Sequence, residues 1–267
     1  MEINMSYNIL LLKDNNNKKA ESAKLLIEEV GRKFSRNFEF EYCDLSSNPQ
    51  EMIYPEIIKK AKSAHAVLLD GYTPALRGIC KGLGLYASVR QIGNITLVSD
   101  AFGGIYDEEK GFRSNPTFGR AAYDVESYSE LEIERVARIA YELSPTRHIT
   151  LIDKADELAT SKLWRKIVTD INEDYPFVNV DMVSIENAIG AVINNSAPDT
   201  LLTSHLFGDI VYGMLSAQQN KSNEFAALLG DTTLGMYTIN DSAYKTIAFM
   251  LKHSFDMQAE ANYLENL

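Results

Sequence analysis

The hydrophobic pattern of the chain alternates between two periods, one typical of buried strands and the other of amphipathic helices. In the first third, short apolar or alternating runs predict three strands, and runs with apolar residues three or four positions apart predict two helices between them. The strands are expected at Asn8–Leu12, Asn37–Tyr42 and Ala66–Leu69, and the helices at Ala20–Phe34 and Gln50–Ser63. This βαβαβ order with short connections predicts parallel strands covered by helices.

The first helix is expected to bury one face that carries Leu25, Leu26, Val30 and Phe34. A further helix is predicted over Ala75–Arg90, although each of its three glycines costs roughly 1 kcal/mol relative to alanine. A strand at Asn94–Ser99 then leads into the loop FGGIYDEEKGF, whose paired glycines allow backbone angles that other residues avoid.

The second half continues the alternation. A helix is expected from Ser129 to Leu143, because Ser129 and Glu132 have the spacing of a capping box. The elements that follow are a strand from His148 with an amphipathic helix up to Val168, a strand at Val178–Val183, a helix at Ile185–Ile193, and a strand and helix from Asp199. Ser216–Asn240 is polar and predicts irregular structure, and Tyr244–Leu264 predicts one final helix.

The alternation indicates an α/β protein. The helix and strand patterns loosen near Tyr86 and again near Ser216, so we expect two lobes. Residues 1–86 and 217–267 would form the first lobe, built from both chain ends, and residues 87–216 the second.

Composition narrows the possible partners. The formal charge of −11 and the pI near 4.9 argue against nucleic acid and anionic membranes, because both require clustered cations. Cys43 and Cys80 are too few for a disulfide framework or a zinc site. With no targeting segment and no apolar run long enough to cross a bilayer, the expected location is cytoplasmic.

Three residues suggest chemistry, and each also has an ordinary structural interpretation. Lys154 stands at the tip of the His148 strand, where it either meets a substrate or is simply a solvated strand end. Asp209 could bind a hard cation such as Mg²⁺ or serve the dipole of a helix N-terminus. Tyr106 could be a general acid or a packed aromatic with a solvated hydroxyl. The four histidines lack metal-ligand spacing, and we interpret all of them as structural.

Several segments in the middle of the chain, taken together and in order, resemble the isopropylmalate/isocitrate dehydrogenase family of β-decarboxylating dehydrogenases. They are LYASVRQ, GGIY, YSELEIERVARIAYEL, LIDKADEL, LWRKIV and PDTLLTSHLFGDI, with a weaker similarity in AFMLKHSF. The resemblance implies a two-lobed fold with a mostly parallel central sheet flanked by helices, in which the second lobe carries the dimer interface. It also implies oxidation of a 3-substituted malate by NAD or NADP with Mg²⁺ or Mn²⁺, followed by loss of CO₂.

The resemblance also assigns roles to individual residues. Tyr106 and Lys154 match the acid/base pair, with Lys154 reaching into the active site of the partner subunit. Arg90 matches an arginine that holds substrate carboxylates, and Asp209 matches a metal-binding aspartate. A lysine can accept the hydroxyl proton as hydride leaves, and a tyrosine can protonate the enol after decarboxylation.

Other matched positions depart from the family. Cys80 and Ser99 stand in place of two substrate arginines. Each arginine lost removes a charge-assisted interaction worth on the order of 1.5–3 kcal/mol. Ile185 and Gly213 stand in place of the other two metal aspartates, although Glu186, next to Ile185, is a possible metal ligand.

The cofactor-binding segments depart as well. The glycine-rich turn after the first strand is replaced by DNNNKK. The loop that grips the adenosine of the cofactor has no counterpart in Gly230–Tyr244, so the chain is expected to be truncated in its C-terminal cofactor-binding part. The cofactor-binding residues of this chain are therefore left unassigned.

Two interpretations remain open. In the first, the chain is an enzyme whose ancestral oxidative decarboxylation is lost or altered, with Arg77, Arg113 or Arg120 replacing the lost anion-binding residues for a small hydroxy acid. In the second, the chain is a noncatalytic regulatory or partner subunit. It would then pair with itself as a homodimer or with a complete family paralogue as a hetero-oligomer.

Overall fold

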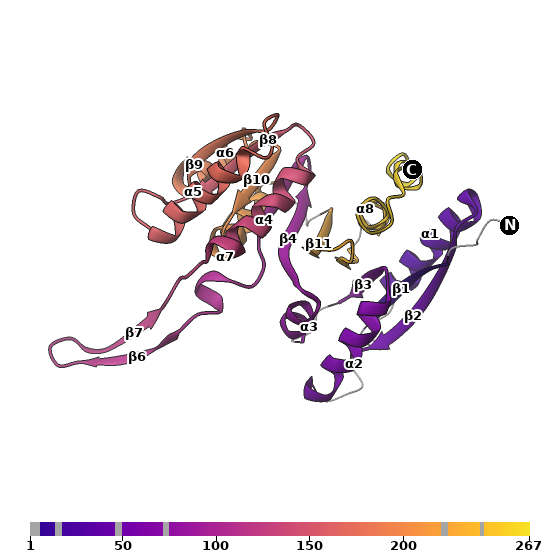
Figure 1. Ribbon diagram of the computed structural model, residues 1–267, viewed down its shortest axis with the longest axis horizontal. Coiled ribbons are helices and arrows are strands. Elements are labelled where there is room, and N and C mark those ends of the chain that lie inside the picture. Colours follow the sequence, from indigo (N-terminus) through magenta and orange to yellow (C-terminus); the bar gives the residue numbers. More distant parts are fainter. Residues whose placement is uncertain (1–5, 14–17, 46–49, 72–74, 220–223, 241–242) are drawn as a thin grey trace. The chain divides into compact units, whose positions relative to one another are not determined.

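The computed structural model describes residues 6–13, 18–45, 50–71, 75–219, 224–240 and 243–267 (Figure 1). The chain divides into two compact units. Residues 1–91 and 223–267 form the first unit, and residues 92–222 form the second. The pattern of the sequence had placed these boundaries at 86/87 and 216/217.

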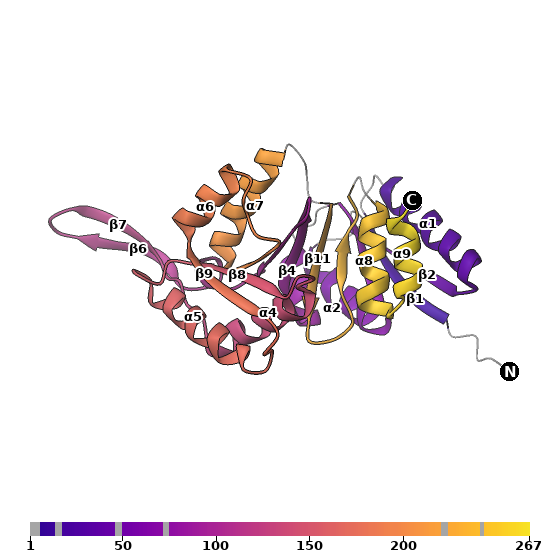
Figure 2. The same ribbon diagram turned by 90° about the horizontal axis from the view of Figure 1, so that it is seen from above.

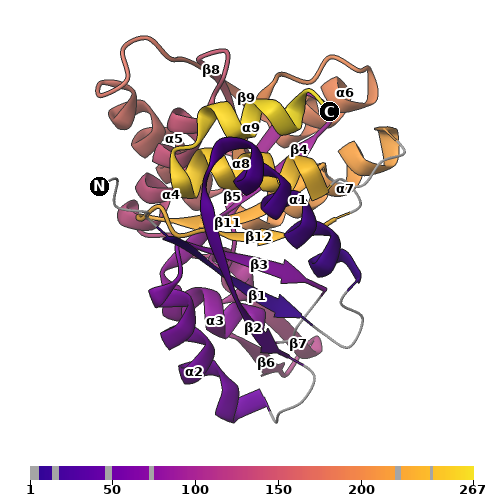
Figure 3. The same ribbon diagram turned by 90° about the vertical axis from the view of Figure 1, so that its right-hand side faces the viewer.

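The first unit begins with the predicted βαβαβ segment, which is confirmed. Its elements are β1 (Ser6–Lys13), α1 (Lys18–Phe34), β2 (Asn37–Asp44), α2 (Gln50–Ser63) and β3 (Ala66–Asp70). Strands β2 and β3 both pair in parallel with β1 (Figure 3). The run Ile9–Leu12 is fully buried, as expected for a strand covered on both faces. The predicted DNNNKK turn lies partly outside the described residues.

Helix α1 buries a face shifted from the one predicted, with Val30 common to both. Leu25 is 62% exposed, whereas Ala20, Ala23, Ile27 and Val30 are fully buried. The buried residues follow the three- and four-residue spacing from Ala20, and the small alanines allow the helix to lie close to its neighbours. The expected face, chosen by side-chain size, was therefore wrong at Leu25.

The helix predicted over Ala75–Arg90 is in fact a short helix followed by a strand. Helix α3 (Leu76–Leu83) ends at Gly84, which has a φ of 70° and caps the helix in the left-handed conformation. Strand β4 (Leu85–Ile92) follows directly. The prediction was wrong for LYASVR because this segment pairs with a strand that is distant in sequence.

That partner lies in the stretch Ser216–Asn240, which was wrongly predicted to be irregular throughout. Strand β11 (Phe225–Gly230) is antiparallel to β4, and β12 (Met236–Thr238) is antiparallel to β11 and parallel to β3. The strand order in this unit is β2-β1-β3-β12-β11-β4. The run FAALLG is only six residues long, too short for its periodicity to stand out locally.

The single helix predicted at the end of the chain is two helices, α8 (Ala243–Phe255) and α9 (Gln258–Glu265). Asp256 between them has a φ of 54°, which interrupts the helical backbone. The amide of Met257 then donates to the Leu251 carbonyl at 2.9 Å and closes the turn.

The second unit contains four parallel strands in the order β5-β10-β8-β9. Their bounds are β5 (Ile95–Asp100), β8 (His148–Asp153), β9 (Asn179–Ser184) and β10 (Thr200–Thr203). One face is covered by α4 (Glu130–Leu143) and α5 (Ala159–Asn172), and the other by α6 (Ile185–Ile193) and α7 (His205–Gln219) (Figure 2). The predicted capping box is confirmed, because the Ser129 amide donates to Glu132 and the Glu132 amide donates to the Ser129 hydroxyl.

Two further elements occupy and follow the predicted glycine-rich loop. A 3₁₀ turn, η1 (Gly104–Tyr106), precedes a hairpin of β6 (Lys110–Asn115) and β7 (Gly119–Asp124). These two strands form a sheet of their own (Figure 1). Within the described parts of the chain, no helix has the length and apolar character needed to cross a membrane.

The close approach of two glycines in the first unit gives a stability prediction. A Cβ atom on Gly230 would lie 2.2 Å from the Gly84 carbonyl oxygen, so the backbone would have to move. We expect Gly230→Ala to lower the free energy of unfolding by about 1–3 kcal/mol in chemical denaturation. Gly190→Ala in α6 meets open space and should raise it by roughly 0.5–1 kcal/mol. Equal stability of the two variants would contradict this packing.

Candidate functional site

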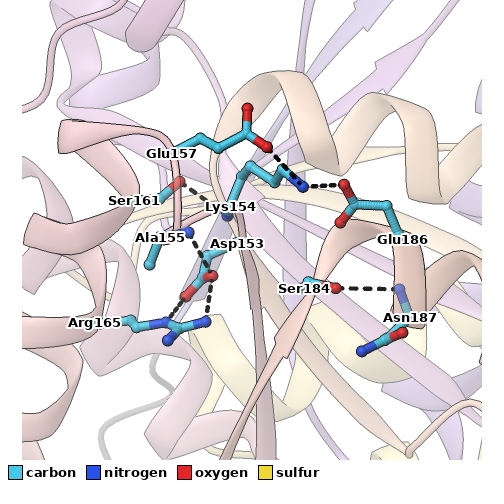
Figure 4. A network of polar contacts seen from close by, with 9 residues as sticks. All are labelled: Asp153, Lys154, Ala155, Glu157, Ser161, Arg165, Ser184, Glu186 and Asn187. Atoms are coloured by element: carbon cyan, nitrogen blue, oxygen red, sulfur yellow. Dashed lines mark hydrogen bonds and ion pairs between the residues drawn. The ribbon is translucent and has the colours of Figure 1, made fainter.

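Lys154 follows β8 directly and lies in an ion-pair network with two acidic residues (Figure 4). Its ammonium group contacts the carboxylate of Glu186, in the first turn of α6, and lies 3.3 Å from Oε1 of Glu157. The Lys154 backbone amide donates to the Ser161 hydroxyl of α5 at 3.1 Å. Both the backbone and the side chain of Lys154 are therefore held in place.

A buried ion pair fixes the strand end that carries Lys154. Asp153 is only 2% exposed, and Arg165 of α5 donates to both of its carboxylate oxygens, at 2.5 and 2.9 Å (Figure 4). The Ala155 amide also donates to Asp153, at 3.0 Å. Because a buried carboxylate without a partner is strongly destabilising, this fork-shaped pair holds the turn after β8.

The acidic neighbours of Lys154 affect its protonation. The hydrogen bond with Glu186 is the largest cause that raises the pKa of Lys154, and Glu157 adds to it. The same hydrogen bond lowers the pKa of Glu186. Lys154 is therefore held as an ammonium ion at neutral pH, whereas proton abstraction requires the neutral amine.

A second group of polar residues brings Tyr106 and Asp209 together. The ring centroids of Tyr106 and His205 are 4.4 Å apart, and Nε2 of His205 lies 3.7 Å from Oδ2 of Asp209. Partial burial is the largest cause that raises the pKa of Tyr106, followed by the charge of Asp209. Tyr106 therefore keeps its proton at neutral pH and can donate a hydrogen bond.

His205 contacts several groups around Tyr106 and Asp209. Besides its contacts with Tyr106 and Asp209, its Nδ1 lies 3.3 Å from the Gly103 carbonyl, and its backbone amide donates to the Tyr128 hydroxyl at 3.1 Å. The signal available in the sequence was the four-residue spacing of His205 and Asp209, which places both on one helix face. Asp209 lies in the second turn of α7, so its interpretation as a first-turn acid is wrong.

Arg90 lies on β4 in the first unit, whereas Tyr106, Lys154, Glu186 and Asp209 lie in the second. The Arg90 side chain is half-buried and shares a strand face with Ser88, which is almost fully buried. Of the three replacement arginines considered, Arg77 lies on α3, and Arg113 and Arg120 lie on the β6–β7 hairpin. The Arg120 guanidinium group lies over the Phe112 ring, 5.1 Å from its centroid.

The two positions that lack the family arginines are packed into the protein interior. Cys80 is fully buried 3.9 Å from the sulfur of Met236, and burial raises the pKa of its thiol to about 12. Ser99 is 3% exposed and lies against Gly208 of α7, where an added Cβ would approach the Ser99 Cβ to 2.6 Å. An arginine at either position would require repacking of its surroundings.

The residues present do not fit the divalent metal that the resemblance implies. Within the part of the chain that the structure describes, no three His, Cys, Asp or Glu side chains are grouped so that they could hold a metal ion. Ile185 belongs to a buried apolar cluster with Val192 and Leu215, and Gly213 has no side chain. Glu186, the possible substitute ligand, is paired with Lys154.

The segment expected to hold the cofactor adenosine is also built differently. Within Gly230–Tyr244, the three residues Met236–Thr238 form β12, and Met236 and Tyr237 are buried. Two hydrogen bonds hold the preceding turn in place. Asp231 accepts one from Tyr86 at 2.6 Å, and the Thr233 carbonyl accepts one from Ser254. The described part of this segment is therefore a turn and a short strand that are held by the rest of the first unit.

Taken together, the fold and these residues define an α/β protein whose polar groups gather after the carboxyl ends of parallel strands. Residues 79–221 match the family model "Isocitrate/isopropylmalate dehydrogenase". The chain belongs to the isocitrate/isopropylmalate dehydrogenase family.

Individual relatives agree with this assignment. The chain is 43% identical over 121 residues to a 3-isopropylmalate dehydrogenase of Pseudoalteromonas translucida, covering 44% of this chain and 34% of that protein. It is 31% identical over 231 residues to the corresponding enzyme of Desulfitobacterium hafniense, covering 73% of this chain and 65% of the relative. The chain thus spans less than two thirds of each of these two relatives.

The fold of the chain resembles that of a solved isocitrate dehydrogenase. A crystal structure of isocitrate dehydrogenase from Methylococcus capsulatus superposes with a TM-score of 0.76 at 17% identity, covering 97% of this chain and 89% of that one. The predicted α/β class with a mostly parallel sheet flanked by helices is therefore confirmed.

The pairing of Lys154 with Glu186 leads to a prediction about pH. Glu186→Gln removes the main cause of the raised pKa of Lys154, so a larger fraction of the amine is neutral at any pH near 9. We expect faster labelling of Lys154 by an amine-reactive reagent, measured by mass spectrometry from pH 8 to 10. Glu157→Gln should have a smaller effect in the same direction, and an unchanged or slower rate in Glu186→Gln would contradict the assignment.

Proposed function

We propose that this chain does not catalyse the metal-dependent oxidative decarboxylation for which its relatives are named. The observation that carries the proposal is the incomplete metal site, in which Asp209 lies near His205 and position 213, one helical turn away, is a glycine rather than a second carboxylate. Without a metal, the negative charge that develops on an enolate lacks its main stabiliser.

The state of Lys154 supports the same proposal. A base in hydride transfer must be neutral when it accepts the hydroxyl proton, and Lys154 lies between two carboxylates that favour its charged form. Tyr106, which keeps its proton, can donate a hydrogen bond to the carboxylate of a small hydroxy acid. An altered reaction that needs proton donors rather than hydride transfer is consistent with this set.

The direct test is an assay of the whole chain with NAD or NADP, Mg²⁺ or Mn²⁺, and each of isopropylmalate, isocitrate, malate and tartrate. We expect no absorbance increase from reduced nicotinamide. An active isopropylmalate dehydrogenase assayed in parallel sets the sensitivity. Saturable turnover that Lys154→Ala abolishes would contradict the proposal.

Adding a second carboxylate near Asp209 tests whether the missing metal ligand prevents metal binding. Gly213 is exposed on α7 with open space around it, and an aspartate there would lie on the same helix face as Asp209. We expect Gly213→Asp to bind Mn²⁺ at least tenfold more tightly than the unaltered chain, measured from the electron paramagnetic resonance signal of free Mn²⁺. Gly190→Asp, which adds the same charge on α6, should match the unaltered chain; equal gains in both variants would contradict the assignment.

A second candidate function is that of a noncatalytic partner subunit that pairs with itself or with a complete paralogue. Exposed apolar side chains on two parts of the second unit favour such pairing. Helices α6 and α7 expose Ile193 and Ile210, and the β6–β7 hairpin exposes Phe112 and Phe118. An isolated two-stranded hairpin is only marginally stable in water, so a partner surface would stabilise it.

Sizing of the purified chain by light scattering tests this pairing. We expect a dimer, and we expect Ile210→Arg to shift it toward the monomer because the charge would lie in an apolar interface. Leu131→Arg is a matched control, since Leu131 is 68% exposed on α4. A monomeric unaltered chain, or equal dissociation of both variants, would contradict the proposed surface.

A further inference from the structure

A cavity lies in the second unit at the opposite edge of the sheet from Lys154 and Asp209. It is lined by residues at or just before the starts of β5 and β10 and by the last two residues of α7, whereas the candidate site residues follow the carboxyl ends of the strands. The Thr96 amide donates to the Asp199 carbonyl at 2.7 Å and joins the two strand starts. Because β5 and β10 are parallel, their starts lie together at this edge, and the cavity is separate from the candidate site.

The cavity has a volume of about 420 Å³. This exceeds the roughly 30 Å³ that one water molecule occupies in the liquid and falls within the range of about 300–1,000 Å³ typical of small-molecule pockets. It is large enough for a small organic ligand. The described residues that line it are Gly93, Asn94, Ile95, Asn195, Ala197, Asp199, Gln218 and Gln219.

The charged and polar groups of this lining favour a positive ligand. Asp199 supplies a carboxylate, and none of the described residues in the lining is a lysine, arginine or histidine. Gln218 uses its amide nitrogen to donate to the Val192 carbonyl and to Asn195 Oδ1, the latter at 2.8 Å. Its carbonyl oxygen is left as a further acceptor.

One helix end adds to the negative potential. Helix α7 ends at Gln219, which lines the cavity, and α6 lies beside it (Figure 2). Gln218 satisfies the last carbonyls of α6. Carbonyl groups at a helix C-terminus carry partial negative charge, so the end of α7 favours a cation over an anion.

We propose that this cavity binds a small primary ammonium compound, whose –NH₃⁺ group is held by the Asp199 carboxylate with the Gln218 carbonyl oxygen as second acceptor. An ammonium group has three donors and no acceptor, which matches a lining whose available oxygens come from a carboxylate and amides. The site is independent of the proposed function, because it uses none of the residues of the candidate site.

The test is calorimetric titration of the full chain with ethanolamine and putrescine as probes, compared with ethylene glycol and glycolate as neutral and anionic analogues of similar size. We expect saturable binding of the amines only. Asp199→Asn should weaken it at least tenfold, which corresponds to about 1.4 kcal/mol. Asp199 is exposed, so this change should leave the unfolding temperature unaltered.

Asp124→Asn on the β6–β7 hairpin is the matched control, since it also removes one carboxylate from an acidic chain. It should bind the amines as the unaltered chain does. Absence of amine binding, equal binding of ethylene glycol, or equal weakening by Asp124→Asn would each overturn the proposal, the last by showing attraction to the overall negative charge.

Discussion

Parallel pairing of β5, β10, β8 and β9 is the constraint on which the chemistry of the second unit depends. Because these strands run in one direction, their carboxyl ends lie at one edge of the sheet. Tyr106 follows β5, His205 and Asp209 follow β10, Lys154 follows β8 and Glu186 follows β9. The same constraint places the starts of β5 and β10 at the other edge, where the cavity with Asp199 is found.

At the carboxyl edge, polar groups contact one another within the chain. Glu186 pairs with Lys154, and Oδ2 of Asp209 lies 3.7 Å from Nε2 of His205. The positions of the missing arginines have become part of the packed interior, as Cys80 and Ser99 show. The strands and helices of the fold are stabilised by buried apolar residues.

Much of the fold was predictable from the sequence because long periodic segments carry their own signal, as in Ile9–Leu12 and in the capping box of Ser129. The errors fall where distant contacts decide the structure. Strand β4 was predicted as helix because its pairing with β11 involves residues about 140 positions later in the chain. The break at Asp256 depends on one backbone angle, which the apolar pattern does not report.

In the candidate site, too, local features were predictable and distant contacts were not. The resemblance suggested Tyr106, Lys154, Arg90 and Asp209, and their roles remain proposals. The contact between Lys154 and Glu186 could not be predicted from the sequence. The two residues are 32 positions apart and approach each other only through the pairing of β8 with β9. His205 was within reach of sequence reasoning, since it lies one helical turn from Asp209.

The central claim, that the metal and cofactor chemistry of the family is absent from this chain, is tested most directly by thermal unfolding with ligands. A ligand that binds the native state raises its unfolding temperature by mass action. With NAD or NADP, Mn²⁺ and isopropylmalate present together, we expect the same unfolding temperature as in a control of equal ionic strength. A rise that requires the nucleotide and grows with its concentration would contradict the claim.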